Sequence, residues 1–222
     1  MCWPISSITK KQIVAVTGLM LVMFIIAHLM GNLFIYGGPE AFNNYAHKLR
    51  GLGALLWAAR AGLLLAFLTH ITFTCLLVME NIEARGGLGR YALDNPVAPR
   101  SLATRFMALS GAYIFIFVVW HLLDFTFIDQ HGPHGMLNGI DQGIYGVVVN
   151  AFADPLHAVL YVLAMCFLGL HLHHGVQSVM QSFGFNHPVW TPVIKKISEY
   201  FSLLIAVGYS SIPMYVFFIV TT

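Results

Sequence analysis

Charge is what this sequence has least of. Only 9% of its 222 residues are Asp, Glu, Lys or Arg, whereas roughly 25% of the residues of an average soluble domain are charged. Hydrophobic residues make up 58% of the chain, and the mean hydropathy is +0.76. Too few charges remain to cover a globule of this size, which excludes a soluble enzyme domain, a disordered chain and a nucleic-acid-binding protein.

Cysteine is also scarce, and its placement excludes several kinds of site. The three cysteines, Cys2, Cys75 and Cys166, lie far apart in the sequence. They form no C-x-x-C pair, no zinc pattern, no C-x-x-C-H motif for covalent haem and no disulfide framework.

Long apolar runs are what the sequence does contain. Five are readable, at residues 12–36, 54–82, 102–128, 153–180 and 193–220. Each exceeds the roughly 20 residues that a helix needs to cross the hydrocarbon core. The first run contains a histidine, and it is too long for a cleavable signal peptide. We therefore expect an all-α membrane protein with one domain over residues 1–222 and five transmembrane helices, the first four forming an up-down bundle.

The basic residues predict the orientation of these helices. Eight of the eleven are expected on one side of the membrane, namely Lys10, Lys11, Arg85, Arg90, Arg100, Arg105, Lys195 and Lys196. Only Lys48, Arg50 and Arg60 fall on the other side. The positive-inside rule then places the N-terminus in the cytoplasm and the C-terminus outside.

Histidine is abundant, and four of the eleven histidines lie deep within the first four runs, one in each: His28, His70, His121 and His171. A polar ring inside the bilayer is costly and marks function. Counted from the cytoplasmic ends, His28 and His121 lie about 26 and 24 Å deep, whereas His70 and His171 lie about 20 and 15 Å deep. The four histidines therefore form an outer pair and an inner pair.

The same pairing follows from bundle geometry. In an up-down-up-down bundle, helices one and three are diagonal, as are helices two and four. Diagonal axes are separated by roughly 12–14 Å, which suits a flat macrocycle with one imidazole on each face. We expect two noncovalent haem b groups, one on His28 and His121 and the other on His70 and His171. Small residues near the ligands would let the backbones approach the macrocycle: Ala27, Gly31, Gly111, Gly169 and Gly175.

Two other interpretations of the histidines stay open. A transition-metal transporter would use intramembrane histidines, although such sites favour carboxylates or thiols that converge on one midplane position. A structural anchor would simply keep each histidine hydrogen-bonded to a neighbour.

Several motifs together resemble a known family. They are HLMGN around His28, PEAFNNYAH ending at His47, WHLLDF at His121 and HLHHGVQSVMQSFGFNH starting at His171. In order, spacing and number of spans, the sequence resembles the dihaem cytochrome b membrane anchors of succinate dehydrogenases and fumarate reductases. It resembles the type with a single five-span anchor. The resemblance implies that the haem-iron ligands are His28 with His121 and His70 with His171.

The resemblance also implies partners and a location. We expect a flavoprotein subunit with the dicarboxylate site and an iron–sulfur subunit, both at the cytoplasmic face of a bacterial inner membrane, and a possible dimer of the complex. Electrons would pass through the haems to or from a quinone, with menaquinone expected, in either succinate oxidation or fumarate reduction. The cytochrome b subunit of another membrane oxidoreductase is the alternative.

The quinone head group is predicted near the outer haem, where the first three spans end. Candidate contacts to quinone or to haem propionates are Asn44, His47, Arg50 and Asp124, with His174 on the inner side. His157 and the loop histidines are interpreted as ordinary polar residues, and Trp120 as an interfacial anchor.

Overall fold

The computed structural model describes residues 5–84 and 106–221. Cys2 and the four arginines predicted in the second connection (Arg85, Arg90, Arg100 and Arg105) lie outside the described residues. Within these described residues, five helices are long and apolar enough to cross a membrane, which confirms the prediction of an all-α membrane protein.

The five long helices keep close to the predicted spans. They are α1 (Ser7–Asn32), α3 (Ala54–Ala84), α5 (Met107–Phe125), α7 (Pro155–Ser182) and α8 (Trp190–Tyr215), the last continuing as a π-helical turn, η3 (Val216–Val220). Local chemistry sets two of the starts. The Ser6 hydroxyl accepts a hydrogen bond from the Thr9 amide at the start of α1, and the Asp154 carboxylate accepts one from the Leu156 amide at the start of α7.

The sequence analysis did not predict the elements between the spans. The first span ends at Asn32 and is followed by η1 (Leu33–Gly37) and α2 (Gly38–Arg50). The third connection contains η2 (Pro133–Gly135), β1 (Met136–Leu137), β2 (Ile140–Asp141) and α6 (Gly143–Ala153). Asn138 and Gly139 both have positive φ and close the hairpin, in which Met136 pairs with Asp141.

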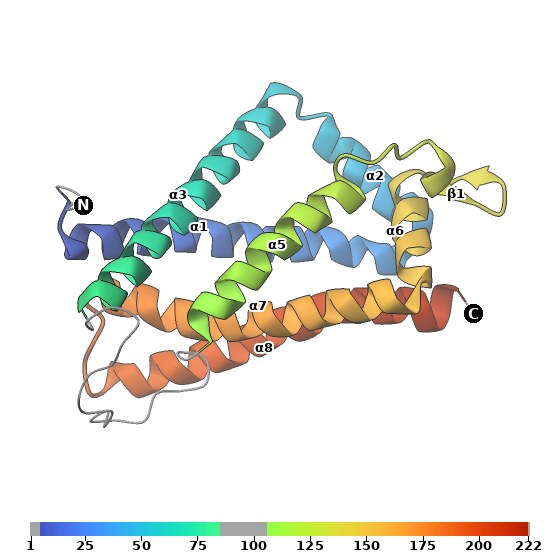
Figure 1. Ribbon diagram of the computed structural model, residues 1–222. Coiled ribbons are helices and arrows are strands. Elements are labelled where there is room, and N and C mark those ends of the chain that lie inside the picture. The colour runs from blue at the N-terminus through green and yellow to red at the C-terminus, as the bar shows by residue number, and fades with distance from the viewer. Residues whose placement is uncertain (1–4, 85–105, 222) are drawn as a thin grey trace.

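The long helices form an incomplete ring (Figure 1). α3 packs against α1, α1 against α7, and α7 against both α5 and α8. α3 and α5 make few backbone contacts and meet through the stacked rings of Phe67 and Phe115, whose centroids are 6.3 Å apart. α1 and α5 are therefore one diagonal of the four-helix arrangement, and α3 and α7 are the other. The two termini lie at opposite ends of the bundle (Figure 1).

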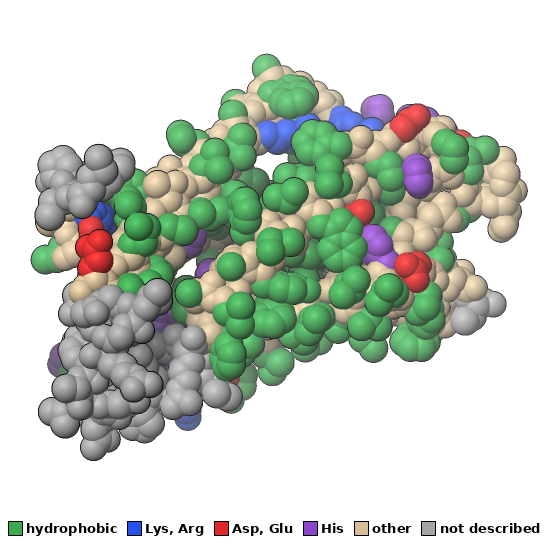
Figure 2. Space-filling view, in the orientation of Figure 1, with side chains coloured by type: hydrophobic (Ala, Val, Ile, Leu, Met, Phe, Trp, Pro, Cys, Tyr) green, Lys and Arg blue, Asp and Glu red, His purple; other side chains and the backbone are tan. Residues whose placement is uncertain are grey.

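Most of the bundle surface is apolar (Figure 2). Large hydrophobic side chains on several helices are mostly exposed, such as Leu65 at 68% and Leu204 at 67%. Apolar helix faces this long and this open are stable against lipid rather than water. At the end with the N-terminus, Lys10 is buried and forms an ion pair with Glu80, which ties α1 to α3.

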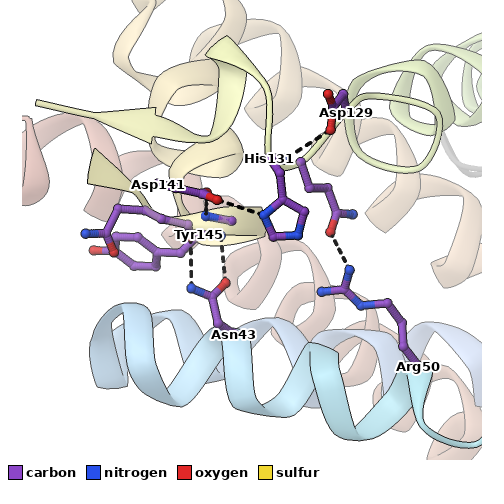
Figure 3. Close-up of polar contacts among 9 residues, drawn as sticks. Asn43, Arg50, Asp129, His131, Asp141 and Tyr145 are labelled. Atoms are coloured by element: carbon purple, nitrogen blue, oxygen red, sulfur yellow. Dashed lines mark hydrogen bonds and ion pairs between the residues drawn. The ribbon is translucent and has the colours of Figure 1, made fainter. Parts of the chain in front are cut away.

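Residues 33–50 and 129–153 form a cap at the opposite end of the bundle. Asn43 on α2 joins the two parts of the cap (Figure 3). Its Nδ2 donates to the Gln142 carbonyl at 2.8 Å, and its Oδ1 accepts from the Tyr145 amide at 3.2 Å. Tyr145 lies in the first turn of α6, where amides have no partner within the helix. Asn43 thus caps α6 from another helix.

The hairpin of the cap is held by a second polar group (Figure 3). The Asp141 carboxylate accepts hydrogen bonds from the Gly143 amide and from His131 Nδ1, each at 2.8 Å. Donation by the Gly143 amide, and then by His131, lowers the pKa of Asp141. Arg50 on α2 donates to the Gln130 side chain at 2.9 Å, so α2 contacts the third connection near its beginning as well as at the start of α6.

We predict that Asn43→Ala destabilises the cap by about 1–3 kcal/mol, because the Tyr145 amide and the Gln142 carbonyl both lose their partner. Thermal unfolding in detergent, and protease cleavage between residues 126 and 142, measure the effect. Asn44→Ala is the matched control, since Asn44 is exposed on the same helix. Equal stability of the two variants would contradict the capping role.

Candidate functional site

The first histidine pair joins one diagonal of the bundle. His28 on α1 and His121 on α5 have ring centroids 5.8 Å apart, with an angle of 82° between the ring planes. Phe24 stacks on His28 and Phe117 on His121, one turn before each histidine on its own helix. Two rings that the sequence separates by more than ninety residues are thereby brought into edge-to-face contact across the bundle.

The second histidine pair joins the other diagonal. His70 lies near the middle of α3 and His171 near the middle of α7, the two helices of that diagonal. His70 Nδ1 lies 3.2 Å from both the Val14 carbonyl and the Thr17 hydroxyl of α1. His171 Nδ1 lies 3.3 Å from the Ser110 hydroxyl of α5. Since Nδ1 is occupied by protein in both rings, Nε2 is left for a metal.

The spacing of the first pair fits a metal that accepts one imidazole on each side. A metal–imidazole bond is about 2.0 Å, so two opposed rings have centres about 6 Å apart, close to the 5.8 Å observed. All four histidines are only half-buried, although they lie at mid-helix.

A metal-ion transporter would need a site where several ligands converge on one ion, which differs from two histidines on opposite sides of a metal. Within residues 5–84 and 106–221, no three His, Cys, Asp or Glu side chains gather closely enough to hold a metal ion. The transporter interpretation needs such a group, whereas coordination on the two faces of a macrocycle needs two histidines.

Glycine lets two of the histidines approach a neighbouring backbone. A Cβ on Gly18 would lie 3.2 Å from the His70 ring, and one on Gly111 would lie 3.4 Å from the His171 ring. The sequence analysis named Gly111 but missed Gly18, which no motif in the sequence marks. The other four predicted small residues do not contact a histidine in this way. Gly31 packs on Tyr45 and Gly169 packs on α8, whereas Gly175 faces open space and Ala27 is exposed.

A buried polar group lies beside the first pair. The Tyr161 hydroxyl donates to Asp124 Oδ2 at 2.6 Å and lies 3.5 Å from His121 Nδ1. His157 Nε2 is 3.1 Å from the same carboxylate oxygen. Trp120, predicted as an interfacial anchor, packs its ring against His157 and Tyr161. Sequence reasoning singled out Asp124 but missed Tyr161 and His157, whose spacing of four residues on one helix was the available signal.

The other predicted contacts are more scattered. Asn44, His47 and Arg50 occupy the exposed side of α2 in the cap, where Arg50 is hydrogen-bonded to Gln130. His174 is half-buried on α7, three residues beyond His171 and on the side of the bundle that carries the N-terminus.

Comparison with known proteins adds one relative. No protein-family model matches the chain, and no solved structure matches it significantly. The chain is 24% identical over 192 residues to the succinate dehydrogenase cytochrome b558 subunit of Bacillus subtilis (strain 168), and the match covers 86% of each protein. This similarity confirms the resemblance that the motifs indicated: the chain is similar to a cytochrome b subunit of succinate dehydrogenase.

Proposed function

We propose that this protein is the membrane anchor and electron-transfer subunit of a succinate dehydrogenase or fumarate reductase. The observation that carries the proposal is the contact of His28 with His121 across one diagonal of the bundle, while His70 and His171 lie on the two helices of the other diagonal. The relative of known name supports it, since that protein is a cytochrome b subunit of succinate dehydrogenase. The dicarboxylate chemistry belongs to a partner flavoprotein.

Two haem b groups are the proposed cofactors, one held by His28 and His121 and the other by His70 and His171. When bound, each iron supplies reversible one-electron transfer. Two histidines would hold each iron, which would leave no coordination position for oxygen. Val14 and Thr17 orient His70, and Ser110 orients His171, so that Nε2 of each ring would be left to bind the iron.

We propose that the end of the bundle with the N-terminus faces the cytoplasm of a bacterial cell. Four described lysines support this orientation, because Lys10 and Lys11 open α1 while Lys195 and Lys196 lie in the first turns of α8 at the same end. The iron–sulfur subunit and its flavoprotein would dock there, closest to the pair of His70 and His171.

The quinone would react at the opposite end, beside the pair of His28 and His121. Reduction of a quinone such as menaquinone consumes two electrons and two protons, and oxidation of the quinol releases them. The electrons would pass through the two haems, and the protons would exchange with the outer water. Polar groups available at that end include Asp124 and the exposed His47 and Arg50 of α2.

We predict two low-spin, noncovalent haem b groups per chain. His28→Ala and His121→Ala should remove the same haem, whereas His70→Ala and His171→Ala should remove the other, because each pair shares one iron. The haem-to-protein ratio after extraction with acid acetone, together with a redox titration of each variant, measures this.

His187→Ala is the control for haem loss, since His187 is exposed in the connection before α8. A folded but colourless protein, or one that binds zinc stoichiometrically, would refute the proposed function. Loss of the same spectral component in the His28 and His70 variants would refute the pairing alone.

A separate prediction concerns the quinone. His47→Ala should retain both haems yet lower kcat/KM for the quinone by about tenfold, which corresponds to about 1.4 kcal/mol of lost transition-state stabilisation. Steady-state kinetics with the whole complex measures it, with His187→Ala as the control at the other end. Normal kinetics in His47→Ala, combined with inhibition in His174→Ala, would move the quinone to the cytoplasmic side.

A further inference from the structure

One histidine of the first pair is linked to a carboxylate through a tyrosine. His121 Nδ1 lies 3.5 Å from the Tyr161 hydroxyl, which donates to Asp124 at 2.6 Å. Tyr161 is 5% exposed, so water does not compete for its hydroxyl. The three side chains come from two helices, α5 and α7, and form a line from the centre of the bundle toward the cap.

Hydrogen-bond chemistry sets the direction of this line. A carboxylate can only accept, so the single hydroxyl hydrogen of Tyr161 goes to Asp124. The hydroxyl oxygen keeps its lone pairs and can accept from the N–H at His121 Nδ1. The imidazole then donates toward a negative charge that lies one hydroxyl away.

Packing holds the line in place. The Tyr161 ring contacts the rings of Trp120, Phe117 and Phe152, with centroids 5.0 to 5.2 Å away. His157 stacks on Tyr161 with an angle of 15° between the planes, and its Nε2 is 3.1 Å from the Asp124 oxygen. Tyr161 and Asp124 are therefore fixed by contacts that do not involve His121.

The second pair has no such link among its described contacts. His70 Nδ1 is next to a backbone carbonyl and a threonine hydroxyl, and His171 Nδ1 is next to a serine hydroxyl. These partners carry no net charge. The difference between the pairs is thus one half-buried carboxylate, presented through Tyr161.

We propose that Tyr161 is a positioning residue for His121, which fixes its ring and conveys the charge of Asp124 to it. The proposal rests on the proposed function, since it treats His121 as an iron ligand. Donation toward a negative charge makes an imidazole more electron-rich, and an electron-rich axial ligand favours ferric over ferrous iron. Tyr161 should therefore lower the midpoint potential of the haem that His28 and His121 hold.

The test is a redox titration of both haems, with electron paramagnetic resonance (EPR) spectra of the oxidised protein. Tyr161→Phe should raise the potential of one haem, the one lost in His121→Ala, and change its EPR signal. Tyr209→Phe is the matched control. Its hydroxyl donates to the Ile25 carbonyl and its ring lies 6.1 Å from His28, so it removes a buried hydroxyl without touching a carboxylate. It should leave both potentials unchanged.

A double-mutant cycle distinguishes an effect of Asp124 that is transmitted by Tyr161 from a direct electrostatic effect of Asp124 on the haem. Asp124→Asn should raise the same potential in the wild-type background and have little effect in the Tyr161→Phe background. An equal rise in both backgrounds would overturn the proposal, because Asp124 would then act through space. If Tyr161→Phe fails to assemble, Asp124→Asn decides, since it keeps the aromatic packing: an unchanged potential overturns the proposal.

Failure of this proposal differs from failure of the proposed function. Two haems with unchanged potentials in Tyr161→Phe would refute only the role of Tyr161. A wild-type protein without haem would refute the proposed function. Ser110→Ala is a further specificity control, and it should affect the other haem, through His171.

Discussion

An imidazole inside a bilayer needs a partner for its ring nitrogens, and the rest of this structure depends on that requirement. Three of the four intramembrane histidines meet it at Nδ1 with a group on a neighbouring helix: α1 serves His70, α5 serves His171 and α7 serves His121. Each of these bonds joins adjacent helices of the ring. The bonds therefore help to fix the rotation of the helices and leave Nε2 of each of the three rings without a hydrogen bond to a neighbouring helix within the part of the chain that the structure describes.

The ring of the first four long helices is open between α3 and α5. α3 and α5 each pack on one neighbour and touch each other mainly through Phe67 and Phe115. A tightly closed four-helix bundle would bury the histidines completely, whereas here they are half-buried. His28 and His121 contact each other across the bundle. Glycines at Gly18 and Gly111 allow two of the rings to lie against a backbone. The arrangement suits a chain whose interior is completed by flat cofactors.

The two ends of the molecule differ in structure. At the end with the N-terminus, the buried Lys10, which is paired with Glu80, lies near the proposed docking face. The opposite end carries a cap in which Asn43 locks α2 to the start of α6. The cap shields the core around Ile35 and Val216, and its Phe152 packs on the rings of Tyr161 and His157 beside the first histidine pair.

The sequence by itself determined the membrane class, the five spans and the choice of four histidines, because apolar run length and intramembrane polarity are local properties of the chain. Bundle rules also predicted the diagonal pairing of His28 with His121. Only the tertiary structure placed α2 and α6 in a cap, since their short helices carry no span-length signal. It also decided that Gly18 rather than Gly31 supports a histidine, and that Tyr161 and His157 join Asp124. Those contacts depend on how α5 and α7 rotate about their axes, which apolar sequence leaves unspecified when every face of a helix is hydrophobic.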